Sequence, residues 1–188
     1  MDRHEQLARI QGELAETSRR AHEIAARLEN EQWRTRPAGD QWSVAECLIH
    51  LNMTSQAFLP LIKGALGKGR DRQVFRSTSA RMDVVGRLLW LAVAVRLPIK
   101  TTEPFVPVRV QPKDTVLSEF DGLQDQVIDC LDAAAELDLG TLRIVSPFDS
   151  RIKYNLYSCL RIIPAHQRHH LRQAEQVVQT LRTTKVAS

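Results

Sequence analysis

Three of the chain's six histidines lie within five positions, in the segment IIPAHQRHHLRQAEQ (162–176). His166 and His170 are four residues apart, so on a helix they lie on one face, one turn from each other, with His169 to the side. The same face carries apolar residues, which directs the pair toward a protein interior. Buried imidazoles need polar partners, and one metal ion serves both. A hydrogen-bonded or interfacial histidine pair has the same spacing, so a metal site requires further ligands.

A third candidate ligand, His50, lies much earlier in the chain, in the sequence WSVAECLIHLNMTSQAF. Ser43 and Glu46 form the capping-box pattern that begins a helix, and His50 follows Glu46 by one turn. Glu46 is therefore a candidate base, or a residue that orients the His50 imidazole, although closing the capping box is a sufficient role for it. The two histidines near the amino end lie among charged residues and are expected to face solvent.

Three neutral imidazoles without a fourth protein ligand form an open coordination site, whereas structural zinc sites usually have four protein ligands. An open site binds a water molecule or a thiol and lowers its pKa, which yields an anionic nucleophile near neutral pH. The spacing therefore permits a catalytic metal site at His50, His166 and His170.

Hydrophobic periodicity predicts five helices that would position these residues, over about residues 4–30, 43–63, 79–97, 115–140 and 155–182. After the second helix, the stretch KGALGKGRDR is expected to be a solvated loop. After the third, PIKTTEPFVPVRVQP is rich in proline and is expected to be a long extended connection. Pro164 is expected to kink the last helix or break it locally. No strand is predicted.

These elements predict an all-α fold, an up-down four-helix bundle with one additional helix and a long proline-rich connection. Residues 1–182 are expected to form a single domain, and residues 183–188 a flexible tail. The interior of a helical bundle is a common place for a metal site, because facing helices contribute ligands to it.

The composition argues against several classes of protein. Three cysteines without a CxxC pair do not indicate a disulfide framework, and the longest apolar run, 88–95, is far shorter than the about 20 residues of a membrane span. The first residues are charged and unlike a signal peptide, so we expect a cytoplasmic protein without a membrane segment. The net charge is +4, but no nucleic-acid recognition motif is present and we do not expect nucleic-acid binding.

Two segments together carry a resemblance to a known family. DQWSVAECLIHL, followed 116 positions after His50 by HQRHHLRQ, resembles the DinB/YfiT-like superfamily of metal-dependent enzymes. Its members carry WS-x-x-E-x-x-x-H on the second helix of a four-helix bundle and H-x-x-x-H-L-x-Q on the last helix. The resemblance covers nearly the whole chain. It implies that His50, His166 and His170 bind a divalent ion, usually zinc or nickel.

The same resemblance implies a class of reaction. Characterised relatives include thiol S-transferases that use bacillithiol, glutathione or mycothiol, a mycothiol-dependent isomerase and hydrolase-like proteins, and dimers are common. We therefore expect a metal-dependent thiol S-transferase acting on a small molecule, and a homodimer. Basic side chains between residues 63 and 81 are candidates to hold the carboxylates of the thiol. The alternatives are a metal-dependent hydrolase and a non-catalytic bundle that dimerises through the apolar helix at 84–97.

Overall fold

A computed structural model describes residues 2–75, 79–95 and 101–186 of the chain. Nearly all of the regular structure in these residues is helical, and the elements follow one another in this order: α1 (Arg3–Ala26), α2 (Asn30–Arg34), α3 (Val44–Asp71), α4 (Val84–Ala94), the 3-10 helix η1 (Glu103–Phe105), α5 (Lys113–Ala133), β1 (Arg143–Val145), β2 (Lys153–Asn155) and α6 (Leu156–Val186).

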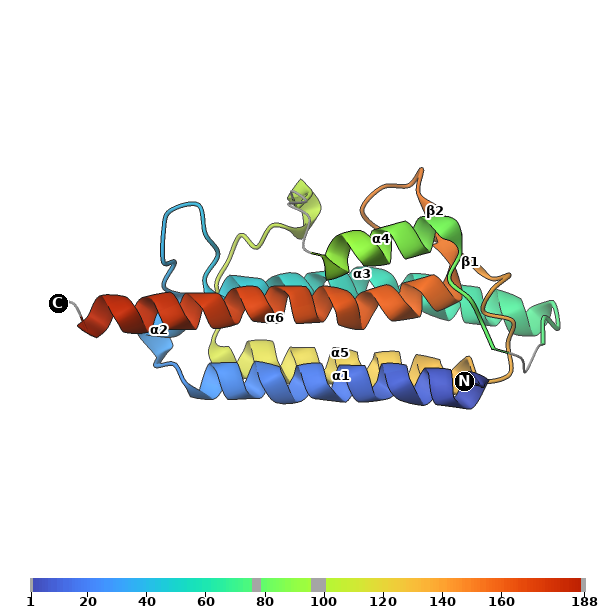
Figure 1. Ribbon diagram of the computed structural model, residues 1–188, viewed down its shortest axis with the longest axis horizontal. Helices are drawn as coiled ribbons and strands as arrows, with labels where there is room; N and C mark the ends of the chain where they lie inside the picture. The colour runs from blue at the N-terminus through green and yellow to red at the C-terminus, as the bar shows by residue number, and fades with distance from the viewer. Residues whose placement is uncertain (1, 76–78, 96–100, 187–188) are drawn as a thin grey trace.

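Four long helices, α1, α3, α5 and α6, form a bundle along the long axis of the molecule (Figure 1). α1 contacts α5 and α6, and α3 contacts the same two helices. In Figure 1 the chain colours show that α1 and α6 run in one direction and α3 and α5 in the other. The predicted all-α bundle is confirmed, with one refinement. Two neighbouring pairs, α3 with α5 and α1 with α6, are parallel, because the chain between α3 and α5 returns along the length of the bundle.

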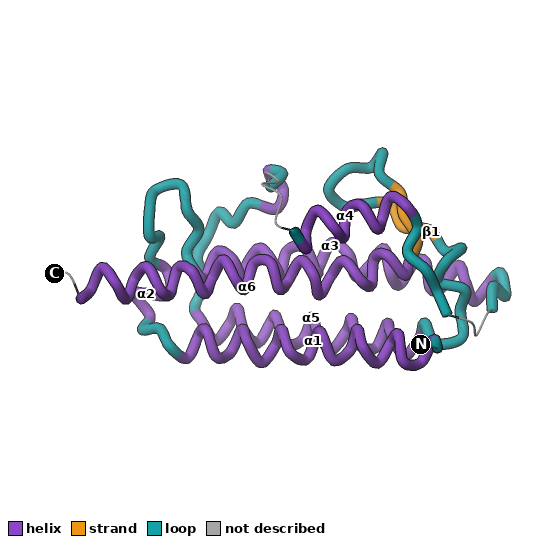
Figure 2. The backbone as a smooth tube through the Cα atoms, viewed as in Figure 1, coloured by secondary structure: helices purple, strands orange, loops and turns teal. Residues whose placement is uncertain are grey.

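The additional helix predicted from the sequence is α4, which packs on α6 outside the four-helix core (Figure 2). Asp83 caps it by accepting from the Gly86 N–H at 2.8 Å. The Asp83 carboxylate also accepts from the Asn155 N–H at 2.9 Å and from Arg143 at 2.6 Å. Gly86 allows a close approach to α6, since a Cβ there would lie 2.2 Å from the Ser158 Cβ. These contacts fix α4 on α6, where it forms one wall of the site.

α3 is longer than predicted, because the stretch KGALGKGRDR continues the helix instead of forming a loop. Gly64 and Gly67 would have nothing within 4 Å of an added Cβ, so neither glycine is required by packing. Gly69 lies against Leu142, where a Cβ would be 2.9 Å from Leu142 Cδ1. Burial of the apolar residues between the glycines outweighs the helix propensity of glycine, which is about 1 kcal/mol poorer than that of alanine.

A small antiparallel hairpin, formed by β1 and β2, was not predicted. Ile144 pairs with Tyr154 in its register, and both side chains are buried. Strands of three residues are too short to show a recognisable alternation in the sequence. Since β2 leads directly into α6, the hairpin holds Tyr154 and Ser146 beside the start of the helix that carries two of the candidate ligands.

A polar layer in the bundle sets the rotation of α6. Thr17 of α1, Gln124 of α5 and Gln167 of α6 are buried, and they bond to one another. Gln167 Nε2 donates to Gln124 Oε1 at 2.7 Å, and Thr17 Oγ1 donates to Gln167 Oε1 at 2.7 Å. Because unpaired buried amides are costly, this network favours one orientation of the helix. With Gln167 facing α1 and α5, His166 and His170 face α3.

α6 is continuous past Pro164, so the local break considered from the sequence is absent. Residues 183–186, which the sequence placed in a flexible tail, continue α6, and residues 187–188 lie outside the described part of the chain. None of the described helices is both long and apolar enough to cross a membrane.

Candidate metal centre

Three imidazoles converge between α3 and α6. His50 projects from α3, and His166 and His170 project from α6, with one ring nitrogen of each within 4.8 Å of the others. His166 Nε2 lies 3.3 Å from His50 Nε2 and 3.1 Å from His170 Nε2. Two nitrogens bound tetrahedrally to one ion at about 2.0–2.1 Å are about 3.3 Å apart. The separations therefore fit three ligands of one ion, and the grouping expected from the sequence is present.

The second nitrogen of two rings is held by a hydrogen bond. His50 Nδ1 lies 2.8 Å from the carbonyl oxygen of Phe105, and His170 Nδ1 lies 3.0 Å from Gln173 Oε1. Carbonyl oxygens only accept, so both Nδ1 atoms carry the proton and both Nε2 atoms present a lone pair. Such outer partners orient metal-binding histidines and raise their basicity.

The three ring nitrogens are better satisfied by one metal ion than by a shared proton. In the metal-free chain, a proton on His166 Nε2 can be donated to only one of the two lone pairs that face it, those of His50 and His170. The other lone pair would remain without a donor in a site where His50 is 2% and His170 is 8% exposed. A buried unsatisfied nitrogen is costly, and one cation between the three lone pairs removes the cost.

The same burial keeps the rings neutral. Burial lowers the pKa of His50 below 6.5, and it lowers the pKa of His166 much further, with repulsion from His170 and His50 adding to the effect. Burial first, and then repulsion from His50 and His169, lower the pKa of His170 to about 3. Metal ligation requires neutral imidazole, so protons compete weakly for this site at neutral pH.

Two further aromatic rings pack against the ligands. The Trp42 ring lies 5.0 Å from the His50 ring and 5.8 Å from the His170 ring, and with His170 it is stacked. The His169 ring lies 5.0 Å from that of His170. The sequence predicted His169 near the surface, but in the structure it is half-buried and lines a cavity beside the ligands. His169 is not part of the three-histidine cluster.

Glu46, the candidate base, is 4% exposed and closes the capping box of α3. Its carboxylate accepts from the N–H and Oγ of Ser43 at 2.8 and 2.9 Å, and from Arg36 Nε at 2.9 Å. Burial alone would raise the pKa of Glu46, but the hydrogen bonds from Arg36 and Ser43 outweigh burial and lower it. These contacts hold an ionised carboxylate at the start of α3. Its action as a base remains a prediction.

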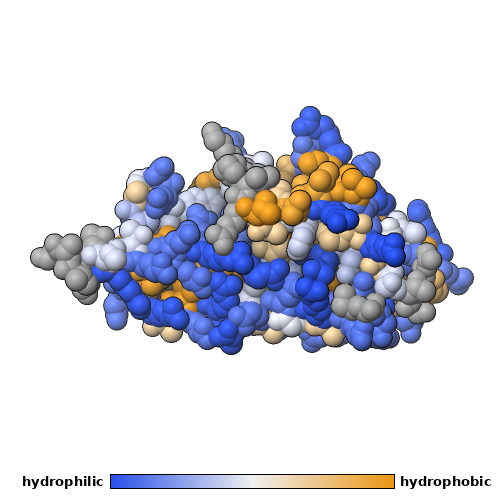
Figure 3. Space-filling model, viewed as in Figure 1, coloured by the Kyte–Doolittle hydropathy of each residue, from blue (hydrophilic) through white to orange (hydrophobic). Residues whose placement is uncertain are grey.

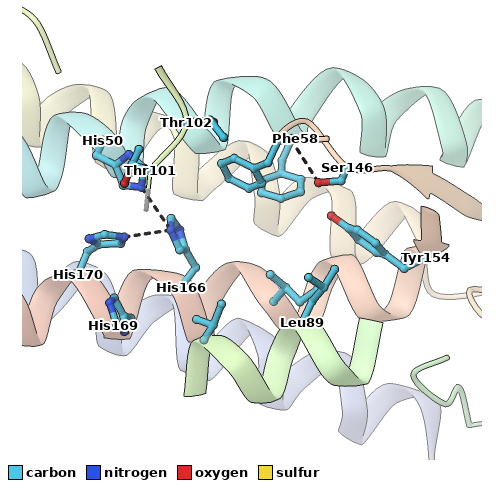
Figure 4. Close-up of a pocket in the computed structure, with 13 residues that line it drawn as sticks. His50, Phe58, Leu89, Thr101, Thr102, Ser146, Tyr154, His166, His169 and His170 are labelled. Atoms are coloured by element: carbon cyan, nitrogen blue, oxygen red, sulfur yellow. Dashed lines mark hydrogen bonds between the residues drawn. The ribbon is translucent and has the colours of Figure 1, made fainter. Parts of the chain in front are cut away.

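A cavity of about 210 Å³ opens beside the three histidines (Figure 4). Its lining comes from α3, α4, α6, the segment that carries Thr101 and Thr102, and the hairpin. None of the described residues between 63 and 81, the stretch expected to hold a thiol carboxylate, lines it.

Sequence reasoning missed several residues around the centre. Trp42 lies in the WS pattern and Gln173 lies at the end of the H-x-x-x-H-L-x-Q pattern. Both residues could therefore have been predicted from the family motifs. Phe105 contributes its backbone carbonyl oxygen, and such a contact cannot be predicted from the type of side chain. Ser146 and Tyr154 reach the cavity only because of the unpredicted hairpin.

Comparison with known proteins identifies one family. The family model described as the DinB superfamily matches residues 13–174, a span that includes all three candidate ligands. No curated protein and no solved structure matches the chain.

Proposed function

Since the chain belongs to the DinB superfamily, we propose that it is a metal-dependent enzyme whose divalent ion is bound by His50, His166 and His170. The convergence of three neutral ring nitrogens beside a cavity supports this proposal most directly. The cluster found in the described residues contains three ligands and no fourth. Three protein ligands leave a coordination position for a substrate, as in catalytic sites. Imidazole ligands suit both zinc and nickel.

The reaction proposed is the transfer of a low-molecular-weight thiol, of the bacillithiol, glutathione or mycothiol type, to an electrophilic small molecule. A bound divalent ion supplies positive charge that lowers the pKa of a coordinated thiol. The thiol must come from outside the protein, because the three cysteines are buried and burial raises the pKa of each. A thiolate formed by the chain itself at neutral pH is therefore disfavoured.

The chain's own residues orient the reactants in this proposal. Phe105 and Gln173 fix the rings of His50 and His170. Trp42 packs on those two rings. Hydrolysis is the close alternative, in which a water molecule replaces the thiol as nucleophile.

The test is thiol transfer by the metal-loaded protein. The sulfur of the thiolate attacks the carbon of a neutral aryl halide, the C–S bond forms and halide leaves with the electron pair of the broken bond. We expect halide release with at least one of the three thiols, its loss in His166→Ala and its retention in His4→Ala, which removes an exposed histidine of α1 outside the cluster. Turnover of esters or amides without any thiol requirement would favour hydrolysis.

A second candidate is a non-catalytic bundle that dimerises through α4. One observation favours it: Val84, Leu88, Leu91 and Val95 are exposed at steps of four, three and four residues. This is the spacing of a helix-pairing seam, and two copies can pair through it by two-fold symmetry. Figure 3 shows apolar surface gathered over this region. The homodimer expected from the sequence is compatible with either function.

A further inference from the structure

The cavity beside the histidines has two chemically different ends. Figure 4 shows His50, His166 and His170 at one end and Ser146 and Tyr154 at the other, with Phe58 and Leu89 between them. A molecule that fills the cavity therefore places one end at the candidate metal centre and the other end at the hairpin.

The walls between the two ends are apolar. Leu89 and Val93 of α4 and Ile162 of α6 line the cavity. So do two aromatic rings, Phe58 and Phe148, which pack edge to face with centroids 5.8 Å apart. Walls of this kind favour an apolar ligand body, because burial of apolar surface is the main source of its binding energy.

The part of the lining that the structure describes carries no formally charged side chain. Among the described residues that line the cavity, none is Asp, Glu, Lys or Arg, and the polar members besides the histidines are Thr101, Thr102, Ser146 and Tyr154. A charged group placed between the apolar walls would lose its hydration without gaining a counter-charge. The described part of the lining therefore favours a ligand with an uncharged body.

The hairpin end carries two neutral hydroxyl groups. Tyr154 is 1% exposed, and burial raises its pKa, so it is a neutral phenol at pH 7. The Tyr154 side chain is hydrogen-bonded to that of Ser146, and Ser146 Oγ also accepts from the Phe148 N–H at 3.3 Å. Hydroxyl groups both donate and accept. This pair can therefore meet one neutral hydrogen-bonding group of a ligand.

The volume limits the size of the ligand. An apolar cavity of about 150 Å³ binds benzene, and sites for drug-sized molecules begin at about 300 Å³. A cavity of about 210 Å³ lies between these, which corresponds to one ring with a short substituent.

We propose that the electrophilic substrate occupies this cavity and is an uncharged molecule, with an apolar body the size of a substituted benzene ring and one neutral hydrogen-bonding group that meets Tyr154 and Ser146. The reaction is the one given by the proposed function, on which this inference rests. The class of electrophilic substrate is what the cavity adds to it. Leu89, Val93 and Ile162 then determine the size of the accepted body, and Tyr154 determines the preference for a polar end group.

The test measures binding of three small probes to the chelator-treated, metal-free protein by calorimetry or by protein NMR shifts. Ethylbenzene and benzyl alcohol have nearly the same shape and differ only in that a hydroxyl group replaces the terminal methyl group, whereas benzoate carries a negative charge. We expect both neutral probes to bind, and benzoate to bind at least tenfold more weakly than benzyl alcohol. Tyr154→Phe should weaken benzyl alcohol by roughly three- to tenfold and leave ethylbenzene unchanged.

A cavity-filling variant tests whether the probes bind in this cavity. Val93→Trp should weaken the binding of both neutral probes more than tenfold, whereas the same substitution at the exposed Val108 should change the binding of neither. If Val93→Trp does not fold, the comparison of probes in wild type and Tyr154→Phe still decides the question. Benzoate binding as tightly as benzyl alcohol, or no binding of either neutral probe, would overturn the proposal. The probes are measured on metal-free protein, so the result tests the cavity and not the metal centre. The metal centre is tested separately, by measuring the metal content of the protein.

Discussion

At the scale of single residues, the centre depends on partners that are not ligands themselves. Gln173 accepts the Nδ1 proton of His170, and this contact leaves the Nε2 lone pair directed at the other two imidazoles. Without that acceptor the ring can rotate or carry its proton on Nε2, and the site loses a ligand part of the time.

We therefore expect Gln173→Leu to weaken binding of the divalent ion by about 10- to 100-fold. Gln173→Glu, which keeps an acceptor, should restore most of the affinity. Gln176→Leu is the matched control, because Gln176 lies on the exposed side of α6. Competition titration with a chromophoric chelator measures all three variants. Equal weakening by the two leucine substitutions would show that Gln173 acts through general stability and not through His170.

The three imidazoles also determine how acid affects the metal-free chain. Their pKa values lie below 6.5 in the folded state, with that of His170 at about 3, and return to about 6.5 on unfolding. Between about pH 6.5 and pH 3 the unfolded chain therefore binds more protons than the folded chain does, so stability falls as the pH falls. Each histidine contributes up to about 1.4 kcal/mol per pH unit.

Urea denaturation at pH 7.5, 6.5 and 5.5 measures this dependence in a range above the titration of carboxylates. We expect stability to decrease mainly below pH 6.5 and the decrease to be smaller in His170→Ala, which has one buried ring fewer. A wild-type stability that is constant from pH 7.5 to 5.5 would contradict the neutral, buried state of the histidines.

At the scale of elements, the position of α4 depends on its close approach to α6. A methyl group at Gly86 would lie 2.2 Å from both Cβ and Oγ of Ser158, so one helix must move. Overpacking of this kind costs about 1–3 kcal/mol. Since α4 contributes Leu89 and Val93 to the cavity, movement would also enlarge or distort the site.

Gly86→Ala should accordingly lower the urea midpoint and weaken binding of neutral aromatic probes. Gly122→Ala in α5 is the control, because an added Cβ there would have nothing within 4 Å. It should stabilise the protein by about 0.5–1 kcal/mol through helix propensity. A Gly86→Ala protein as stable as Gly122→Ala would show that α4 is not fixed by this contact.

The elements also show what sequence patterns can predict. The capping box at Ser43 and the spacing of His166 and His170 depend on neighbours within one or two helical turns, and both were predicted. The hairpin and the helical glycine stretch depend on distant partners. Tyr154 is buried by tertiary packing, and Gly69 is helical because it packs against Leu142. Local periodicity contains no information about such partners, so these features were missed.

At the scale of the whole molecule, the seam on α4 predicts an association between two copies. Sedimentation velocity should give about twice the chain mass of 21.4 kDa. Leu88→Glu should return the protein to a monomer, because Leu88 is 62% exposed at the centre of the seam and a charge there would be buried on pairing. Val108→Glu, at an exposed site outside the seam, should leave the dimer intact. A monomeric wild type would exclude this use of α4.

The bundle as a whole brings together His50, His166 and His170, which are separated by more than a hundred positions, and we expect them to bind one ion. The most direct test is elemental mass spectrometry of the protein purified without an affinity tag and reloaded with zinc or nickel. About one ion per chain is expected in the wild type and in His169→Ala, and a substoichiometric amount in His50→Ala, His166→Ala and His170→Ala. Full occupancy in all three ligand variants, or no metal in the wild type after reloading, would show that these histidines do not form the metal centre.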